Sequence, residues 1–309
     1  MAESQPLINS SFSKQNPQLQ IAWDSTSLGL LKTCPRKYFL TMIENWHQKN
    51  QSLHLDFGIF YHKALEEYDK ARAAGLSYDS GVELSVRRAL EISRGFIGDN
   101  YKNRQTLIRA IVWYLEHFRE DTAQTIILAN GKPAVELSFK MELPLSSPDG
   151  SPYLACGHLD RAVEWQDQVY IMDRKTTKGQ VGSFYFDKYS PNNQMSMYSL
   201  AGKVVLGREA AGIIIDAVQL AVGFARFARG IVNRTKGQLD EWLDDTLLWI
   251  KMAERFADDG YWPMNDQSCD MYGGCAFRQV CSKDASVRKN FLEADFVKRV
   301  WDPLVSRED

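Results

Sequence analysis

The sequence of 309 residues has little net charge, little glycine or proline and no long apolar run. Its 37 basic and 39 acidic residues leave a formal charge of −2, so any contact with nucleic acid must come from a local basic strip rather than from bulk attraction. With 20 glycines and 10 prolines, a collagenous or low-complexity fibre is excluded. The longest apolar stretch, 210–225, contains Asp216 and Gln219 and is too short and too polar to span a bilayer.

A secretory leader is also not visible at the start of the chain. The first residues, Met1–Gln5, offer neither a basic segment nor an apolar one. We therefore expect a cytoplasmic protein, of a bacterium, an archaeon or a phage-infected host cell, whose thiols stay reduced.

Aromatic residues are plentiful, with 15 Phe, 13 Tyr and 8 Trp, and they exclude disorder for most of the chain. The length suits one large domain or two modest ones. We expect four regions, which are a flexible arm over 1–20, a helical region over 21–130, a mixed α/β core over 131–260 and a cysteine-bearing region with a helix over 261–309.

Hydrophobic periodicity predicts helices, then a strand-rich middle, then helices, which indicates an α/β fold with a mixed sheet flanked by helices. The first helix is expected to begin with Ser25 as its cap and to break at Pro35. Further helices are expected over 57–74, 80–129, 192–205, 239–258 and 290–301. Strands are expected over 135–143, 153–165, 169–176, 213–222 and 227–234. The first of them is expected to be half-buried, because its apolar residues alternate strictly with a second set that includes Glu136.

Two acids and a lysine stand on adjacent predicted strands. Asp160 ends the motif GHLD, and Asp173 and Lys175 follow in DRK. Side chains alternate along a strand, so Asp173 and Lys175 point one way and Arg174 the other. Two carboxylates suit Mg²⁺ or Mn²⁺, and the lysine can orient or deprotonate water or stabilise a phosphate. This is equipment for metal-assisted phosphodiester hydrolysis, although an Asp–Lys surface pair would give the same pattern.

Three more polar residues lie on predicted helices. Gln194 and Tyr198 are four residues apart and share a face, and an amide and a phenol ring suit the backbone and base of a single strand. His62 would favour Mn²⁺ over Mg²⁺ as a further metal ligand. Alternatively, it pairs with Glu66 one turn later.

A local basic strip runs from residue 223 to residue 236 and contains no acid. It is either a nucleic-acid contact or the solvated edge of a strand. Its basic residues are Arg226, Arg229, Arg234 and Lys236, with Phe224 and Phe227 between them.

The order of these motifs, G-x-x-x-H at Gly58–His62, then G-H-x-D, D-x-K and Q-x-x-x-Y, resembles the RecB-like branch of the PD-(D/E)xK nuclease superfamily. The opening from Ser27 to Tyr38 is similar too, as is a core with one cysteine before it and three after it. The resemblance covers residues 24 to 285 and extends to CRISPR-associated and phage-encoded RecB-like exonucleases and to the AddB nuclease domain. It implies a restriction-endonuclease-like fold, with a helical arch over 63–130.

The resemblance also implies roles for individual residues. His62, Asp160 and Asp173 would bind Mn²⁺ or Mg²⁺, and the carbonyl of Arg174 would complete the shell. Lys175 would be the catalytic lysine. The DNA-contacting pair would be Gln194 and Tyr198, and Glu136 is a less secure match to a further acid of the family.

Five cysteines are present, and three of them fall within thirteen residues. In a reduced compartment such a group indicates metal or iron–sulfur ligation before disulfides. The spacing C-x5-C-x5-C lacks the close pair of a zinc ribbon, and buried free thiols are the remaining alternative. The resemblance implies a [4Fe–4S] cluster at Cys34, Cys269, Cys275 and Cys281. Cys156 is expected to be a small buried residue.

Together these features predict a metal-dependent DNA nuclease, an exonuclease acting on single strands or ends in recombination, repair or phage biology. One alternative is a non-catalytic, cluster-stabilised DNA-binding module. Another is a sequence- or structure-specific endonuclease on the same core. No G-x-x-x-x-G-K-[S/T] pattern occurs, so unwinding would need a helicase or recombination partner.

Overall fold

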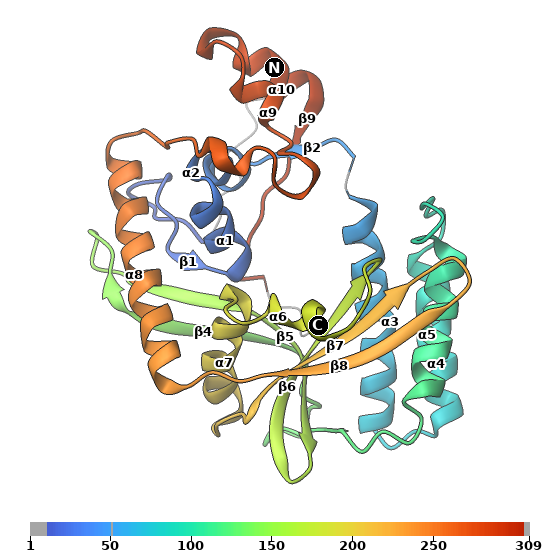
Figure 1. The fold of residues 1–309 in the computed structure, drawn as a ribbon. Helices are drawn as coiled ribbons and strands as arrows, with labels where there is room; N and C mark the ends of the chain where they lie inside the picture. Colours follow the sequence, from blue (N-terminus) through green and yellow to red (C-terminus); the bar gives the residue numbers. More distant parts are fainter. Residues whose placement is uncertain (1–10, 51, 306–309) are drawn as a thin grey trace. The chain divides into compact units, whose positions relative to one another are not determined.

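The computed structural model describes residues 11–50 and 52–305 of the chain (Figure 1). They divide into two compact units. Unit 1 comprises 11–50, 140–157 and 237–305, and unit 2 comprises 52–139 and 158–236. The boundaries between the units fall within the strands β4 (Val135–Ser146) and β5 (Pro152–Trp165), which contribute residues to both.

Unit 2 contains a mixed sheet, in which β5, β6 (Gln168–Thr177), β7 (Gly212–Leu220) and β8 (Ala225–Val232) lie in that order. Strands β5 and β6 are antiparallel, β6 and β7 are parallel, and β7 and β8 are antiparallel. The sequence of β7, GIIIDAVQL, is buried along its whole length, as expected for a central strand. The short strand β3 (Gln124–Thr125) pairs with β5.

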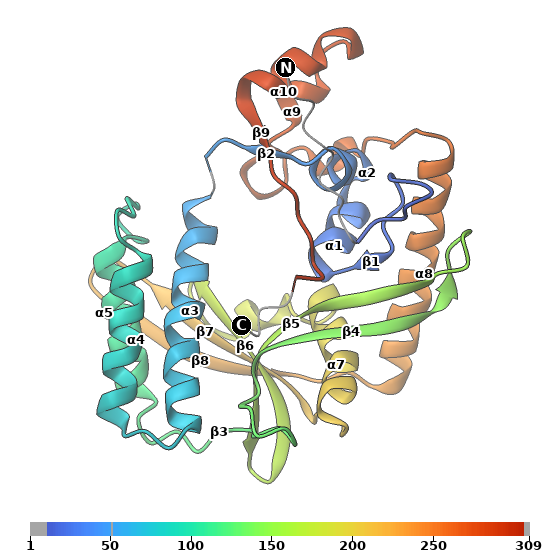
Figure 2. The same cartoon turned by 180° about the vertical axis from the view of Figure 1, so that it is seen from behind.

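Three helices of unit 2 lie side by side and cover one face of this sheet (Figures 1 and 2). They are α3 (Leu53–Ala73), α4 (Tyr78–Ile92) and α5 (Arg104–His117). Their apolar residues, among them Phe57, Leu65 and Ile111, form a core with Val218 and Leu220 of β7. The parallel pair β6–β7 is connected through α6 (Ser183–Asp187) and α7 (Asn193–Leu206), and Gly202 of α7 lies close to Ile171 of β6.

Unit 1 brings together segments from both ends of the sequence. Strand β1 (Ala22–Trp23) pairs in parallel with β5, and β2 (Trp46–Gln48) pairs with β9 (Phe296–Lys298). The rings of Trp23 and Tyr38 stack, and the ring of Tyr38 contacts that of Trp262 at an interplanar angle of 40°. The remaining helices of unit 1 are α1 (Ser25–Thr33), α2 (Pro35–Tyr38), η1 (Phe39–Ile43), α8 (Lys236–Asp258), η2 (Asp266–Ser268), η3 (Met271–Gly273), α9 (Arg278–Cys281), η4 (Ala285–Val287) and α10 (Arg288–Asp295).

The structure confirms the mixed sheet flanked by helices and corrects several element boundaries. Asp24, not Ser25, caps α1, because its side chain accepts the N–H of Ser27 in a capping box. The helical stretch expected over 80–129 is two helices separated by the loop 93–103. The last helix ends at Asp295, because the next residues pair with β2.

Two other expectations concern segments rather than single elements. Residues 63–130, expected as an arch, include α4, α5 and part of α3, which pack on the sheet. Of the arm expected over 1–20, residues 1–10 lie outside the described part. Within 11–20, Ser11, Leu19 and Gln20 are buried. Across the described ranges, no helix has the length and apolar character needed to cross a membrane.

Candidate active site

Three elements of unit 2 bring a histidine and two acids to one point. His62 of α3, Glu136 of β4 and Asp160 of β5 each offer a ligand atom, and these atoms lie within 4.8 Å of one another. His62 Nδ1 lies 3.2 Å from Asp160 Oδ2. The pairing of His62 with Glu66 is not formed, because Glu66 binds Lys63 and Lys70 instead. One imidazole and two carboxylates are a suitable donor set for Mn²⁺ or Mg²⁺.

Glu136 reaches this group through an unusual backbone. Strict alternation along 134–143 placed its side chain on the polar face, and that expectation is wrong, since the residue is 3% exposed. Its φ of +51° breaks the alternation, and Val135, Glu136 and Leu137 are all buried. A left-handed φ at a residue other than glycine costs on the order of 1 kcal/mol and tends to persist at functional sites.

The alternation expected around Arg174 is confirmed. Lys175 Nζ lies 2.7 Å from Asp173 Oδ2, and the Arg174 side chain points the other way, to the buried Asp69 at 2.6 Å. The backbone of Arg174 faces the metal-binding group with both of its polar atoms. Its N–H donates to Asp160 Oδ2 at 2.8 Å, and its carbonyl oxygen lies 2.9 Å from Nε2 of His62. The carbonyl is therefore placed to serve as a further ligand.

The two central acids differ in how firmly they hold a proton. Burial would raise the pKa of Asp160, but the charge and hydrogen bond of His62, with Lys175 and the N–H of Arg174, hold it below its usual range. Burial raises the pKa of Asp173, and the neighbouring Asp160 adds to this against the opposing effect of Lys175. Neighbouring carboxylates with divergent pKa values are typical of catalytic and metal sites.

The two nitrogen bases of the site, Lys175 and His62, have raised pKa values. Burial opposes the protonated form of Lys175, but Asp173 and Asp160 outweigh it and raise the pKa of the ammonium. Burial also opposes protonation of His62, and its contacts with Asp160 raise that pKa as well. The lysine is therefore charged at neutral pH.

Gln194 of α7 connects Lys175 to Tyr198. Lys175 Nζ donates to Oε1 of Gln194 at 3.1 Å, and Nε2 of Gln194 donates to the Tyr198 hydroxyl at 3.0 Å. The Tyr198 ring is 7% exposed and packs edge-on against Phe139. A buried ring has little surface for stacking on a base, so this geometry supports a positioning role for Tyr198.

The three arginines expected to contact DNA have different surroundings. Arg229 pairs with Asp121 at 2.7 Å and with Asp216 at 3.5 Å. Arg234 donates to the carbonyl of Tyr189 at 2.6 Å and to the hydroxyl of Ser196 at 3.2 Å. Both guanidinium groups are therefore committed to protein partners in this structure.

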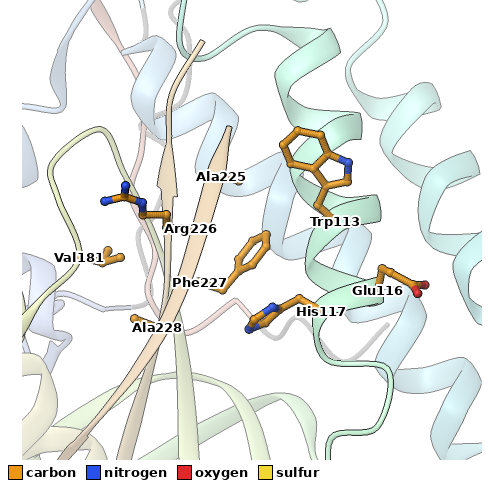
Figure 3. Close-up of a pocket in the computed structure, with 8 residues that line it drawn as sticks. All are labelled: Trp113, Glu116, His117, Val181, Ala225, Arg226, Phe227 and Ala228. Carbon is orange, nitrogen blue, oxygen red and sulfur yellow. The ribbon is translucent and has the colours of Figure 1, made fainter. Parts of the chain in front are cut away.

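Arg226 is the exposed member of the three. It lies in register with Gln219 and Thr177, on the sheet face that carries Lys175. It lines an open pocket of about 610 Å³ (Figure 3). The other lining residues are Trp113, Glu116, His117, Val181, Ala225, Phe227 and Ala228.

A buried ionic network behind the site was not found from the sequence. Asp69, 1% exposed, pairs with Arg174 and lies 3.4 Å from Arg161. A carboxylate between two guanidinium groups fixes the strand that carries Asp173 and Lys175. The available signal was an acid placed seven residues after His62, at helical spacing from the buried apolar residues Tyr61 and Leu65.

The four cysteines of the expected cluster all belong to unit 1. The N–H of Cys275 donates to the carbonyl of Cys269 at 2.8 Å, and the N–H of Asn265 donates to Sγ of Cys34 at 3.3 Å. Burial raises the pKa of Cys269 and of Cys281, and in each case the thiols of Cys275 and Cys34 raise it further. The four thiols thus lie near one another. Cys156 stands apart from them and is 1% exposed.

A cluster of acids, a histidine and a lysine on a mixed sheet defines a class of metal-dependent phosphodiester-cleaving enzymes. The family model of the PD-(D/E)XK nuclease superfamily matches residues 23–282. The chain belongs to this superfamily.

Two solved structures are similar to this chain. The crystal structure named "Putative exonuclease" from Eubacterium rectale has a TM-score of 0.50 at 12% identity, covering 94% of this chain and 98% of that one. At that identity the likeness shows the fold alone. A structure named SSO0001 has a TM-score of 0.28 at 13% identity, covering 65% of this chain and 87% of that one. No curated protein matches.

Proposed function

We propose that this protein is a metal-dependent deoxyribonuclease, and that it cleaves phosphodiester bonds at the group formed by His62, Glu136, Asp160, Asp173 and Lys175. One observation carries the proposal. Ligand atoms of His62, Glu136 and Asp160 lie within 4.8 Å of one another, and Asp160 accepts the N–H of Arg174, which stands between Asp173 and Lys175 on β6.

The residues have distinct roles in this proposal. His62, Glu136, Asp160 and Asp173 hold the ion, together with the carbonyl of Arg174. A divalent ion in this position supplies charge for the phosphoryl oxygen and lowers the pKa of water. Lys175, held between Asp173 and Gln194, orients the attacking water and stabilises negative charge on the phosphate.

We further propose that the substrate is a single strand or a strand end and that the enzyme is an exonuclease. The exposed Arg226 supports this, because it lies on the sheet face that carries Lys175, and a cation is a usual contact of the backbone of a single strand. The order of motifs in the RecB-like branch supports it as well.

The test is cleavage of end-labelled linear and circular single strands with Mn²⁺, Mg²⁺ or EDTA. We expect metal-dependent release of short products from linear strands and little cleavage of circles. Rapid cutting of circles would contradict the exonuclease and favour an endonuclease. Binding without cleavage under every metal condition would favour a non-catalytic module.

We also propose that Cys34, Cys269, Cys275 and Cys281 bind a [4Fe–4S] cluster. In a tetrahedral zinc site with Zn–S bonds of about 2.3 Å, sulfur atoms lie roughly 3.8 Å apart. Among the described cysteines, no three sulfur atoms lie within 4.8 Å of one another. Four neighbouring thiols at a wider spacing fit a larger cluster better.

A further inference from the structure

A second group of charged residues lies in unit 2, at the end of strand β6. Lys178 follows this strand, and Lys102 Nζ donates to Thr176 Oγ1 within it at 3.1 Å. His54, on the first turn of α3, is close enough for Lys102 and Lys178 to lower its pKa, although burial is the larger cause. We call Lys102, Lys178, Tyr101 and His54 the strand-exit group.

Two lengths along the chain limit how far this group can lie from the proposed metal ligands. Lys178 follows Lys175 by three residues, which is about 10 Å along an extended chain. His54 precedes His62 by eight residues, which is about 12 Å along a helix. Both elements therefore lead from the candidate active site to the strand-exit group over about 10 to 12 Å of chain.

Lys102 lacks the partner that a buried cation normally has. It is 4% exposed, and no carboxylate in the described chain forms an ion pair with its ammonium. Its contacts are one hydroxyl and the face of the Phe57 ring, whose centroid is 5.4 Å away. An ammonium offers three donors, and a buried charge is costly unless it is paired. The positive charge of Lys102 is therefore available to an anion.

A rigid loop holds Lys102 in this position. The carboxylate of Asp99 accepts the N–H of Tyr101 at 2.8 Å and that of Lys102 at 2.6 Å, and its other oxygen pairs with Lys178. Gly98 approaches the loop so closely that a Cβ atom there would lie 1.6 Å from the carbonyl oxygen of Lys102. The geometry is thus built into the chain rather than produced by loose surface side chains.

The exposed side of the group suits a nucleotide. Lys178 lies over the ring of Tyr101, with 5.1 Å between its Nζ and the centroid, and Tyr101 is 42% exposed. Asp99 forms an ion pair with Lys178 and none with Lys102, so one carboxylate faces two ammonium groups and the group has a net positive charge. A cation beside an open aromatic ring is a recurrent contact of single-stranded nucleic acid.

We propose that the strand-exit group binds a phosphate of the nucleic-acid substrate next to the cleavage site. Lys178 contacts the phosphate, and the buried Lys102 supplies a second positive charge. Tyr101 stacks on the adjoining base. The proposal rests on the proposed nuclease function and adds to it a phosphate subsite. The phosphate is either an internal diester or a terminal monoester.

The test is binding of a fluorescent single-stranded oligonucleotide to the full chain in EDTA, over a series of salt concentrations. Lys102→Met and Lys178→Met are each expected to weaken binding several-fold and to reduce the slope of log affinity against log salt by roughly 0.7. Asp99→Asn keeps an oxygen for the loop but releases Lys178, so it is expected to tighten binding and steepen the slope.

The control is Lys203→Met, which removes an exposed lysine paired with Glu209 and is expected to leave the slope unchanged. Thermal unfolding separates binding from structure. Removing a buried unpaired charge raises the melting temperature of Lys102→Met, whereas a purely structural lysine would lower it.

Three substrates distinguish the sources of phosphate, namely a linear strand with a 5′-phosphate, the same strand with a 5′-hydroxyl, and a circle. Equal losses of affinity for all three substrates would show that the bound phosphate is an internal diester. A loss of affinity confined to the strand with a 5′-phosphate would show that it is a terminal monoester. Unchanged slopes in both lysine variants would overturn the inference and leave the nuclease standing. If the lysine variants reduce the salt slope of binding but the wild type cleaves no substrate, the phosphate subsite is supported and the proposed nuclease function is wrong.

Discussion

Asp160 and Asp173 carry the same functional group but hold a proton with different strength. Asp160 accepts from the backbone of Arg174 and faces His62, whereas Asp173 is almost fully buried beside Lys175. The difference arises from surroundings that converge only in the folded chain. At this scale, the consequences of single substitutions can be stated.

Asp173→Asn and Lys175→Ala are each expected to lower the rate of strand cleavage at least about 100-fold, because each removes charge that stabilises the transition state. Cleavage is measured on an end-labelled strand, and circular dichroism checks the fold. Glu209→Gln, an exposed acid paired with Lys203, is the matched control. Near wild-type cleavage by either site variant would show that the site is assigned incorrectly.

Glu136→Gln and His62→Ala test the metal donors. We expect Mn²⁺ to support cleavage by the wild type at least as well as Mg²⁺, and His62→Ala to lose this advantage, since imidazole is the softer donor. Glu136→Gln is expected to raise the metal concentration needed for half-maximal cleavage. Metal titrations of the rate give both results, and an unchanged titration in Glu136→Gln would remove that residue from the ligand set.

Lys102 makes the stability of the folded protein depend on pH. Burial, with a smaller effect from Lys178, lowers its pKa from 10.5 to about 8. Between these values the unfolded chain binds the proton more readily than the folded one, so this residue makes the fold more stable as pH rises from 8 to 10.5. The gain in urea midpoint of Lys102→Met over wild type should therefore shrink from pH 7.5 to pH 10. A constant gain would contradict the lowered pKa.

At the scale of elements, the sequence was most informative where a repeating pattern met no interruption. The alternation of β6 predicted correctly that Asp173 and Lys175 share a face, and the apolar run over 213–222 predicted the strand β7. The strand β4 was misjudged at Glu136, because a positive φ at one residue leaves no trace in an alternating pattern. The partners of Arg229 and Arg234 lie far away in sequence, so periodicity could not show them.

The loop 93–103 between α4 and α5 was likewise not predicted, because the apolar residues on both sides of it have helical spacing. Gly98→Ala tests its role. The added methyl group would meet the backbone of Lys102, so a loss of about 1–3 kcal/mol in the free energy of unfolding is expected, together with a flatter salt dependence of strand binding. Urea unfolding measures the first effect. Gly29→Ala, which has open space around it in α1, is the control and should not lose stability.

At the scale of the whole molecule, the proposed iron–sulfur cluster would join residues that are distant in sequence. Protein purified without oxygen is expected to be brown, and Cys34→Ser is expected to lose the colour and to melt at a lower temperature, because Cys34 would no longer connect α2 to the loop of Cys269 and Cys275. Cys156→Ser should keep the colour. A colourless anaerobic preparation with one zinc per chain would contradict the iron–sulfur cluster and leave the nuclease proposal intact.

The division into two units affects the order in which parts of the chain can fold during synthesis. All residues of the candidate active site lie between His62 and Tyr198, and unit 2 ends at residue 236. The proposed cluster, by contrast, could not be completed until Cys281 has left the ribosome, because its ligands extend from Cys34 to Cys281. Domains generally fold as units during translation. We therefore expect the candidate active site to assemble in unit 2 before Cys281 is synthesised, while unit 1, which contains residues 11–50, is still incomplete. A nascent chain would thus carry its catalytic groups before the segment that closes unit 1 exists.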